Sequence, residues 1–206
     1  MPELAAWDVV AWRLLAVVGG LVGWFVTQRL IGERRLADGV MYDQLHRMTA
    51  GGNAWLHEHP GAARAVLIGS SLAIDVVTLF VLGYALLGPS FSPFLGLLSL
   101  FALRQLSQAL VALPPPDGII WRHPGFPSLF VTYSVGNDFF FSGHTALAVY
   151  GAIQVATLGI PALTVVAALL AVAQMLLVIL LRAHWTLDVL GGLFAALLVG
   201  VLSWPA

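Results

Sequence analysis

Long apolar runs constrain this chain more than any other feature of its sequence. An α-helix needs about 20 apolar residues to cross the hydrocarbon core of a bilayer, and it satisfies its own backbone hydrogen bonds there. Six stretches meet this requirement: residues 9–31, 65–87, 91–113, 142–159, 161–182 and 185–204. The sequence therefore predicts an all-α integral membrane protein with six transmembrane helices in one bundle.

The composition agrees with this fold and excludes several classes of function. Charged residues make up only 9% of the chain, whereas roughly a quarter of the residues in a soluble domain are charged. The net charge of −1 leaves no basic face for a nucleic-acid partner, and the absence of cysteine excludes disulfides and thiolate metal sites. No repeat or second domain is evident, so residues 1–206 are expected to form a single membrane domain.

The connections between the helices decide which residues meet. An even number of spans places both chain ends at one membrane face, so the long connections 32–64 and 114–141 share the opposite face with the turn at 182–185. We expect the active site at that face. The 32–64 connection mixes polar and apolar residues and predicts a helix lying on the membrane, whereas the prolines of 114–141 exclude a continuous helix.

Arginine is concentrated at the face with the long connections. Arg34, Arg35, Arg47 and Arg64 lie there, against Arg13 at the other face. The positive-inside rule makes the arginine-rich face cytoplasmic. The same arginines also suit the binding of an anionic substrate, and the sequence leaves both interpretations open.

Two histidines are the candidates for chemistry. His144 and His184 lie 40 residues apart, about the length of one span down and one span back, so both return to one face. Asp188 follows His184 by one helical turn, where its carboxylate can accept a proton from one ring nitrogen and leave the other free to attack. His144 is then the second imidazole, able to give and take a proton. The alternative is that these residues are polar contacts between packed helices.

The start of the helix that carries His144 predicts a phosphate site. Ser142 is a suitable N-cap residue, and the free amides of the first turn, which includes Gly143 and Thr145, bind anions readily. Arg104 adds a planar cationic fork that matches phosphate oxygens, about 13 Å below the active face. Its alternative role is a buried ion pair with Asp75, which lies at a comparable depth.

These motifs resemble those of a known family. "NDFFFSGHT" and "AHWTLDV" resemble the two catalytic motifs of sphingomyelin synthases and their relatives, integral membrane members of the type 2 phosphatidic acid phosphatase superfamily. "LRQLSQALVALPPP" resembles an arginine motif in the third span of those synthases, and the similarity covers roughly residues 100–192. The resemblance implies that His184 attacks phosphorus, that Asp188 orients it and that His144 protonates the leaving alcohol. It also implies a site role for Asp138, whose alternative is an exposed loop acid.

The chain departs from the lipid phosphatases of that superfamily in its cations. Those enzymes carry a lysine-arginine motif and an arginine five residues before the second histidine, but this chain has no lysine and has Ile179 at the latter position. Arg182, two residues before His184, remains a candidate phosphate ligand. Fewer cations suit a phosphodiester better than a phosphomonoester, which carries more negative charge.

The sequence therefore predicts a membrane phosphotransferase that uses no cofactor and no metal. A phospholipid donor passes its head-group phosphate to His184, and a lipid alcohol such as ceramide accepts it, or water does so in a phospholipase C. The alternatives are a lipid phosphate phosphatase and, outside enzymes, a transporter or scaffold. A further histidine pair, in the segment 57–59, predicts solvated surface residues rather than metal ligands. We expect a multi-pass protein of a bacterial-type cell membrane, and a homo-oligomer is compatible with the sequence.

Overall fold

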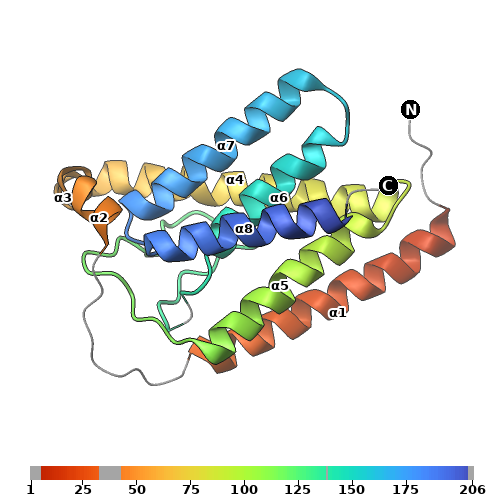
Figure 1. Cartoon of the computed structure of the whole chain (residues 1–206), viewed down its shortest axis with the longest axis horizontal. Coiled ribbons are helices and arrows are strands. Elements are labelled where there is room, and N and C mark those ends of the chain that lie inside the picture. Colours follow the sequence, from red (N-terminus) through yellow and green to blue (C-terminus); the bar gives the residue numbers. More distant parts are fainter. Residues whose placement is uncertain (1–5, 33–42, 138, 204–206) are drawn as a thin grey trace.

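The computed structural model describes residues 6–32, 43–137 and 139–203. Eight α-helices lie in these residues (Figure 1): α1 (Trp7–Gly32), α2 (Gln44–Met48), α3 (Ala50–Glu58), α4 (Pro60–Leu87), α5 (Ser92–Leu110), α6 (Gly143–Ala156), α7 (Pro161–Leu180) and α8 (Thr186–Ser203). Within the same residues there is no β-strand, which confirms the predicted all-α class.

The long helices run alongside one another, and their ends gather in two groups. The beginning of α1 and the end of α8 lie at one end of the bundle (Figure 1). The other end, called the site end below, holds α2, α3, the connection between α5 and α6, the beginning of α6 and the turn between α7 and α8. The site end is therefore built from the long connections, as the even number of spans predicted.

Four helices are long and apolar enough to cross a bilayer. They cover residues 7–30, 60–87, 161–180 and 186–203. The predicted spans 91–113 and 142–159 correspond to α5, which has 19 residues and carries Arg104, and to α6, which has 14 residues. A helix of 14 residues is about 21 Å long, shorter than the hydrocarbon core of about 30 Å. By length and composition, the described residues thus provide four candidate spans of the six predicted.

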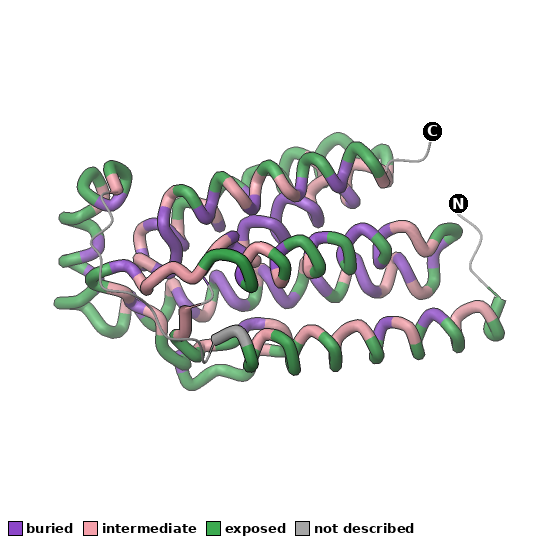
Figure 2. The backbone as a smooth tube through the Cα atoms, turned by 60° about the horizontal axis from the view of Figure 1, so that its bottom comes forward, coloured by how far each residue is buried: buried purple, intermediate pink, exposed green. Residues whose placement is uncertain are grey.

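The outer surface of the bundle is apolar. Exposed residues follow the outward sides of the helices (Figure 2), and large apolar side chains are common among them. Leu15, Leu169, Phe194 and Val201 are each more than 60% exposed. A surface of this kind exceeds what a soluble monomer shows and suits contact with lipid tails.

The segment predicted as one interfacial helix is two short helices followed by an early start of α4. α2 and α3 meet at Thr49, and α4 begins at Pro60, five residues before the predicted start of that span. Proline is tolerated in the first helical turn because its missing N–H needs no partner there. Pro60 therefore begins the long helix and shortens the connection.

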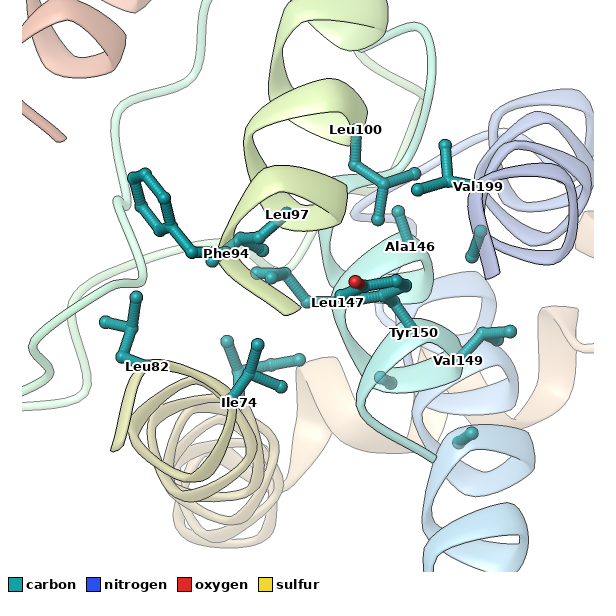
Figure 3. Close-up of a cluster of buried hydrophobic side chains, with 14 of the residues drawn as sticks. Ile74, Leu82, Phe94, Leu97, Leu100, Ala146, Leu147, Val149, Tyr150 and Val199 are labelled. Atoms are coloured by element: carbon teal, nitrogen blue, oxygen red, sulfur yellow. The ribbon is translucent and has the colours of Figure 1, made fainter. Parts of the chain in front are cut away.

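The core surrounds α6, which packs against α4, α5, α7 and α8. Figure 3 shows Tyr150 of α6 among Ile74, Leu97 and Val199 from three of these helices. The Tyr150 hydroxyl donates a hydrogen bond to Pro93 O at 3.1 Å, so this buried polar group is satisfied. α6 is thus held on several sides, and its first turn lies at the site end.

Candidate active site

Ser142 begins α6 and organises the first histidine motif. Its Oγ accepts a hydrogen bond from Thr145 N at 3.3 Å, which confirms the predicted N-cap. Ser142 N donates to Asp188 O at 2.9 Å, so the motif is tied to the first turn of α8. His144 is the second residue of the helix that starts at this cap.

The two predicted catalytic histidines lie side by side. Their ring centroids are 6.2 Å apart, so the spacing of one span down and one span back does return both to one face. His184 Nδ1 is 3.5 Å from Asp188 Oδ2, and that oxygen also accepts a hydrogen bond from Trp185 N at 3.0 Å. A buried carboxylate beside Nδ1 favours the proton on this nitrogen and leaves the lone pair on Nε2.

Two glycines of α8 let the histidine motifs approach each other. A Cβ on Gly192 would lie 2.5 Å from Ser142 O, and a Cβ on Gly191 would lie 3.0 Å from Phe141 Cβ. Neither neighbouring atom is the end of a flexible side chain, so a larger residue would push α8 away from the start of α6. The glycine pair therefore keeps the two motifs together.

A cavity of about 70 Å³ lies beside the histidines. Of the predicted site residues, His144, His184, Arg104 and Gly143 line it. The rest of the wall includes residues of α1, α4 and the connection between α5 and α6: Gln28, Ile74, Trp121, Phe130 and Phe139. The structure thus brings the histidine pair, the arginine and the start of α6 together around one space.

The other predicted site residues have different positions. Asp188 is fully buried behind His184, and Ser142 and Thr145 are fully buried in the cap of α6. None of the three lines the cavity in the described part of the chain. Asp138 lies outside the described residues.

Arg182 points toward α2. Its Nη2 donates a hydrogen bond to His46 O at 2.6 Å, and it is not among the described residues that line the cavity. The prediction that Arg182 binds phosphate has no support from this position.

Arg104 is held rigidly beside the start of α6. Its Nε donates to Phe141 O at 3.0 Å, and its Nη1 donates to Gln108 Oε1 at 3.3 Å and to Gln28 Oε1. A Cβ on Gly143 would lie 3.2 Å from Arg104 Nε, so the guanidinium lies directly against the first residue of the helix. Among the described residues of the cavity wall, Arg104 is the one with a permanent charge. A fixed cation next to a helix start suits an anionic group in the cavity.

Asp75 tethers the connection between α5 and α6. Its carboxylate accepts hydrogen bonds from Ser128 Oγ at 3.1 and 3.2 Å and from the N–H groups of the next two residues at 3.0 Å each. The sequence offered Asp75 as an ion-pair partner of Arg104, and the structure shows it as the anchor of a loop.

A second contact ties the same connection to α4, one turn before Asp75. Ser71 Oγ shares a hydrogen bond with the Tyr133 hydroxyl. Burial raises the pKa of Tyr133, so this hydroxyl keeps its proton.

The His144 ring and Trp121 both line the cavity. The two rings are nearly perpendicular, with a centroid distance of 5.0 Å. His144 Nε2 is buried and has no hydrogen-bond partner among the described residues. A buried polar atom without a partner is costly, and a substrate oxygen in the cavity would supply one.

The contribution of α2 was missed by the sequence reasoning. Asp43 accepts hydrogen bonds from Thr186, and His46 donates one to His184 O. The only local signal was an aspartate three residues before a histidine, the pattern of a helix N-cap. Such a pattern reveals the start of a helix and says nothing of its partner across the fold.

The histidines of the segment 57–59 are exposed, as the sequence predicted. His57 Nε2 donates to Gly118 O at 3.1 Å, and the His59 ring stacks on Trp55 at a centroid distance of 4.4 Å. In the part of the chain that the structure describes, no three metal-ligating side chains form a group that could hold an ion.

Comparison with known families identifies the chain. A family model described as AtPDCT1/2 matches residues 42–204, which include α2 to α8 and every residue that lines the cavity except Trp24 and Gln28. The chain belongs to the AtPDCT1/2 family. This family comprises phosphatidylcholine:diacylglycerol cholinephosphotransferases and is related to the type 2 phosphatidic acid phosphatases and sphingomyelin synthases. No curated protein and no solved structure matches the chain significantly.

Membership in the AtPDCT1/2 family confirms the broader part of the resemblance drawn from the histidine motifs. It implies a lipid head-group transferase in the form of a multi-pass integral membrane protein. The match also extends well beyond residues 100–192, where the sequence motifs lie, and reaches α2.

Proposed function

We propose that this protein transfers a phosphocholine head group from phosphatidylcholine to a lipid alcohol, diacylglycerol. The observation that carries the proposal is the pair of imidazoles 6.2 Å apart, one of them backed by a buried carboxylate. An attacking nitrogen and a proton donor need this arrangement on either side of one phosphorus atom. Membership in the AtPDCT1/2 family supports phosphocholine as the transferred group.

In the first half of the reaction, His184 Nε2 attacks the phosphorus of phosphatidylcholine. A P–N bond forms, and the bond between phosphorus and the glycerol oxygen breaks. His144, protonated at the start, gives its proton to that oxygen, so diacylglycerol leaves as a neutral alcohol. Asp188 stabilises the positive charge that develops on the His184 ring.

The second half reverses these steps with another lipid. The hydroxyl of the acceptor diacylglycerol gives its proton to His144 while its oxygen attacks phosphorus. The P–N bond breaks, and His184 returns to its neutral form. Because the leaving and accepting alcohols are of one class, the reaction exchanges head groups between lipid pools and consumes no water.

The charge of the cavity supports a phosphodiester substrate. Arg104 is its one permanent cation among the described residues, and Arg182 is directed to α2. A phosphodiester carries one negative charge, which a single guanidinium matches, whereas a phosphomonoester needs more neutralisation. A lipid phosphate phosphatase is therefore the less favoured activity.

The covering of the cavity supports a lipid acceptor over water. The aromatic residues Trp121, Phe130 and Phe139 form part of its wall, and Asp75 ties the segment around Phe130 to α4. A closed apolar cover excludes bulk water from a reactive phosphohistidine. Transfer to a lipid hydroxyl that arrives from the bilayer then competes well with hydrolysis.

An apolar groove next to the cavity supports lipid substrates. It has a volume of about 290 Å³ between α4, α6 and α7, and Gln174 is the polar exception in its wall. Ile74 lines both the groove and the catalytic cavity. A lipid with its phosphate at the histidines thus has an apolar path for an acyl chain away from the site end.

We also propose that α5 and α6 complete a single membrane domain of six spans. Both helices pack against the four candidate spans: α5 contacts α1, α4 and α8, and α6 contacts α4, α7 and α8. With α5, α6 thus packs against four other helices. An enclosed helix does not need to match the bilayer by its own length, because its neighbours cover it. Six spans also agree with the beginning of α1 and the end of α8 lying together, away from the site end.

Lipid turnover by the purified protein in vesicles tests the proposed function. The vesicles contain phosphatidylcholine labelled in its choline and diacylglycerol with acyl chains that give the product a new mass. Labelled phosphatidylcholine with the new chains, formed by the wild type and absent in His184→Ala, is the expected result. A labelled phosphosphingolipid formed with added ceramide would change the acceptor, and free phosphocholine would make the protein a phospholipase C. Inorganic phosphate released from phosphatidic acid would favour the phosphatase, and no turnover of any of these lipids would contradict an enzyme of this class.

A further inference from the structure

The turn that carries His184 is closed by hydrogen bonds to α7 and is also held by contacts with other segments. It lies between the end of α7 at Leu180 and the start of α8 at Thr186, so His184 is not part of a helix. Arg182 within it has a φ of 55°, in the left-handed region, which costs a residue other than glycine roughly 1–2 kcal/mol. Hydrogen bonds to α7 accompany this conformation: Arg182 N donates to Ile179 O at 3.0 Å, and Ala183 N donates to Val178 O at 2.9 Å. His184 O and Thr186 have their partners elsewhere in the molecule.

Two side chains supply contacts of this kind: Asp43, the N-cap residue of α2, and His46 within α2. His46 Nε2 lies 2.9 Å from His184 O, and it donates the hydrogen bond because a carbonyl can only accept. The Asp43 carboxylate accepts from Thr186 N at 2.6 Å and from Thr186 Oγ1 at 2.7 Å. α2 thus holds the backbone at His184 itself and at the second residue after it.

The other residues of the turn complete this contact. Arg182 Nη2 donates to His46 O at 2.6 Å, and the His46 ring stacks on Trp185 at a centroid distance of 5.3 Å. His46 is only 3% exposed. Every residue from Arg182 to Thr186 except Ala183 therefore meets Asp43 or His46.

The charges of α2 suit these hydrogen bonds. Burial acts to raise the pKa of Asp43, but hydrogen bonds from Thr186 and His46 outweigh it and lower the pKa, so the carboxylate is ionised. Burial lowers the pKa of His46, so its ring is neutral with the proton on Nε2. Asp43 Oδ1 also accepts from His46 N at 3.1 Å. One carboxylate thereby fixes the starts of both α2 and α8.

We propose that Asp43 and His46 are positioning residues for His184, which makes α2 a working part of the active site. The proposal rests on the proposed function, in which His184 attacks phosphorus. The contact of the His184 ring with Asp188, at 3.5 Å, is long for a hydrogen bond, and Asp188 holds the backbone only at the next residue, through Trp185 N. α2 fixes the backbone from which that ring projects. A displacement of about 1 Å costs on the order of 100-fold in rate, so the loss of this support has a large kinetic effect.

The test compares two substitutions of His46 in the full-length protein. His46→Leu removes the donor to His184 O, whereas the amide of His46→Gln can still donate. We expect kcat for transfer from phosphatidylcholine to fall about 10- to 100-fold in His46→Leu, with KM within about twofold of the wild type because the substrate contacts remain. His46→Gln is expected to recover most of the loss. Met48→Ala, at an exposed position of the same helix, is the matched control and keeps the wild-type kcat.

A milder variant covers the case in which His46→Leu fails to fold. Thr186→Val removes the hydroxyl that donates to Asp43 and keeps the shape of the side chain and its backbone N–H. We expect kcat to fall about tenfold, the lower limit for the loss of one hydrogen bond to a charged group, and KM to stay unchanged.

The outcomes separate this proposal from the proposed function. A fall in kcat at constant KM, with recovery in His46→Gln, supports the positioning role. Wild-type kcat in both His46→Leu and Thr186→Val, or losses confined to KM, overturns it while the transferase activity stands. A wild type without transfer activity overturns the proposed function and this inference together.

Discussion

His144 and His184 line the same cavity, yet different kinds of structure hold them. His144 lies in the first turn of a regular helix, behind the N-cap Ser142, and that helix packs against four others. His184 lies in an irregular turn that α2 and the α5–α6 connection support through hydrogen bonds. One histidine is placed by its own helix. The other is placed by a turn that is held both by hydrogen bonds to α7 and by segments distant in the sequence.

The difference matters for a double displacement. The attacking nitrogen of His184 must hold its direction through bond formation and bond cleavage, whereas His144 only exchanges a proton. The residue with the stricter geometric demand has the more elaborate support. Substitutions that affect one support and spare the other can therefore separate the two roles.

The largest effects are expected from removal of either imidazole. Each of His144→Ala and His184→Ala should lower transfer from phosphatidylcholine by about 10³-fold or more. p-Nitrophenyl phosphocholine distinguishes them, because p-nitrophenolate leaves without a proton. Release of p-nitrophenolate, followed by absorbance, should recover in His144→Ala and stay absent in His184→Ala. Recovery in both variants, or in neither, would contradict the assignment of nucleophile and acid.

The next effect is expected at the contact between the two histidine motifs. The methyl group of Gly192→Ala would lie 2.5 Å from Ser142 O and should force α8 away from α6. Overpacking of this kind costs about 1–3 kcal/mol, so the melting temperature should fall by several degrees and transfer should slow at least tenfold. Gly69→Ala is the matched control, since a Cβ there meets nothing within 4 Å. A variant at Gly192 with wild-type stability and rate would contradict the role of the glycine.

A smaller effect is expected when the cover of the cavity is released. Asp75→Ala removes four hydrogen bonds to the segment around Ser128 and should admit water to the phosphohistidine. The ratio of free phosphocholine to transferred phosphocholine should rise severalfold, and mass spectrometry of both products measures it. Asp117→Ala, at an exposed position of the same connection, should leave the ratio unchanged. An unchanged ratio in Asp75→Ala would mean that the cover does not control water.

The smallest effect concerns the pH dependence of the support for His184. Because burial lowers the pKa of His46 in the folded protein, its contribution to stability is complete above the ordinary imidazole pKa and declines as the pH falls below it. Between about pH 7.5 and pH 5.5, the melting temperature of the wild type should fall by roughly 2–4 °C more than that of His46→Gln. Equal losses in the two proteins, measured by thermal unfolding in detergent, would show that His46 is not held neutral.

The sequence predicted the parts of the fold that repeat a pattern. Apolar runs located the long helices to within a few residues at most ends, because burial in lipid demands a minimum length of apolar helix. The same length predicted that His144 and His184 meet, and their ring distance of 6.2 Å confirms it. Asp188, one helical turn from His184, was also found by periodicity alone.

Contacts made by irregular segments had no such pattern. His46 belongs to a helix of five residues and Asp43 is its N-cap, and the sequence of this segment does not reveal that it docks on the turn of His184. Asp75 was expected near a cation, but its carboxylate accepts hydrogen bonds from backbone N–H groups. Almost every residue has such a group, so the sequence does not indicate which of them will be the partner. Arg182 was close to His184 in sequence, and its left-handed backbone accompanies a side chain directed to α2.

The most direct test of the central claim is to trap the covalent intermediate. The protein is incubated with phosphatidylcholine in the absence of diacylglycerol, digested under mildly alkaline conditions that preserve phosphohistidine, and examined by mass spectrometry. The account predicts a phosphocholine adduct on His184 that disappears when diacylglycerol is added, with an equal amount of new phosphatidylcholine formed. Steady transfer without an adduct on His184, or with the adduct on another residue, would contradict it.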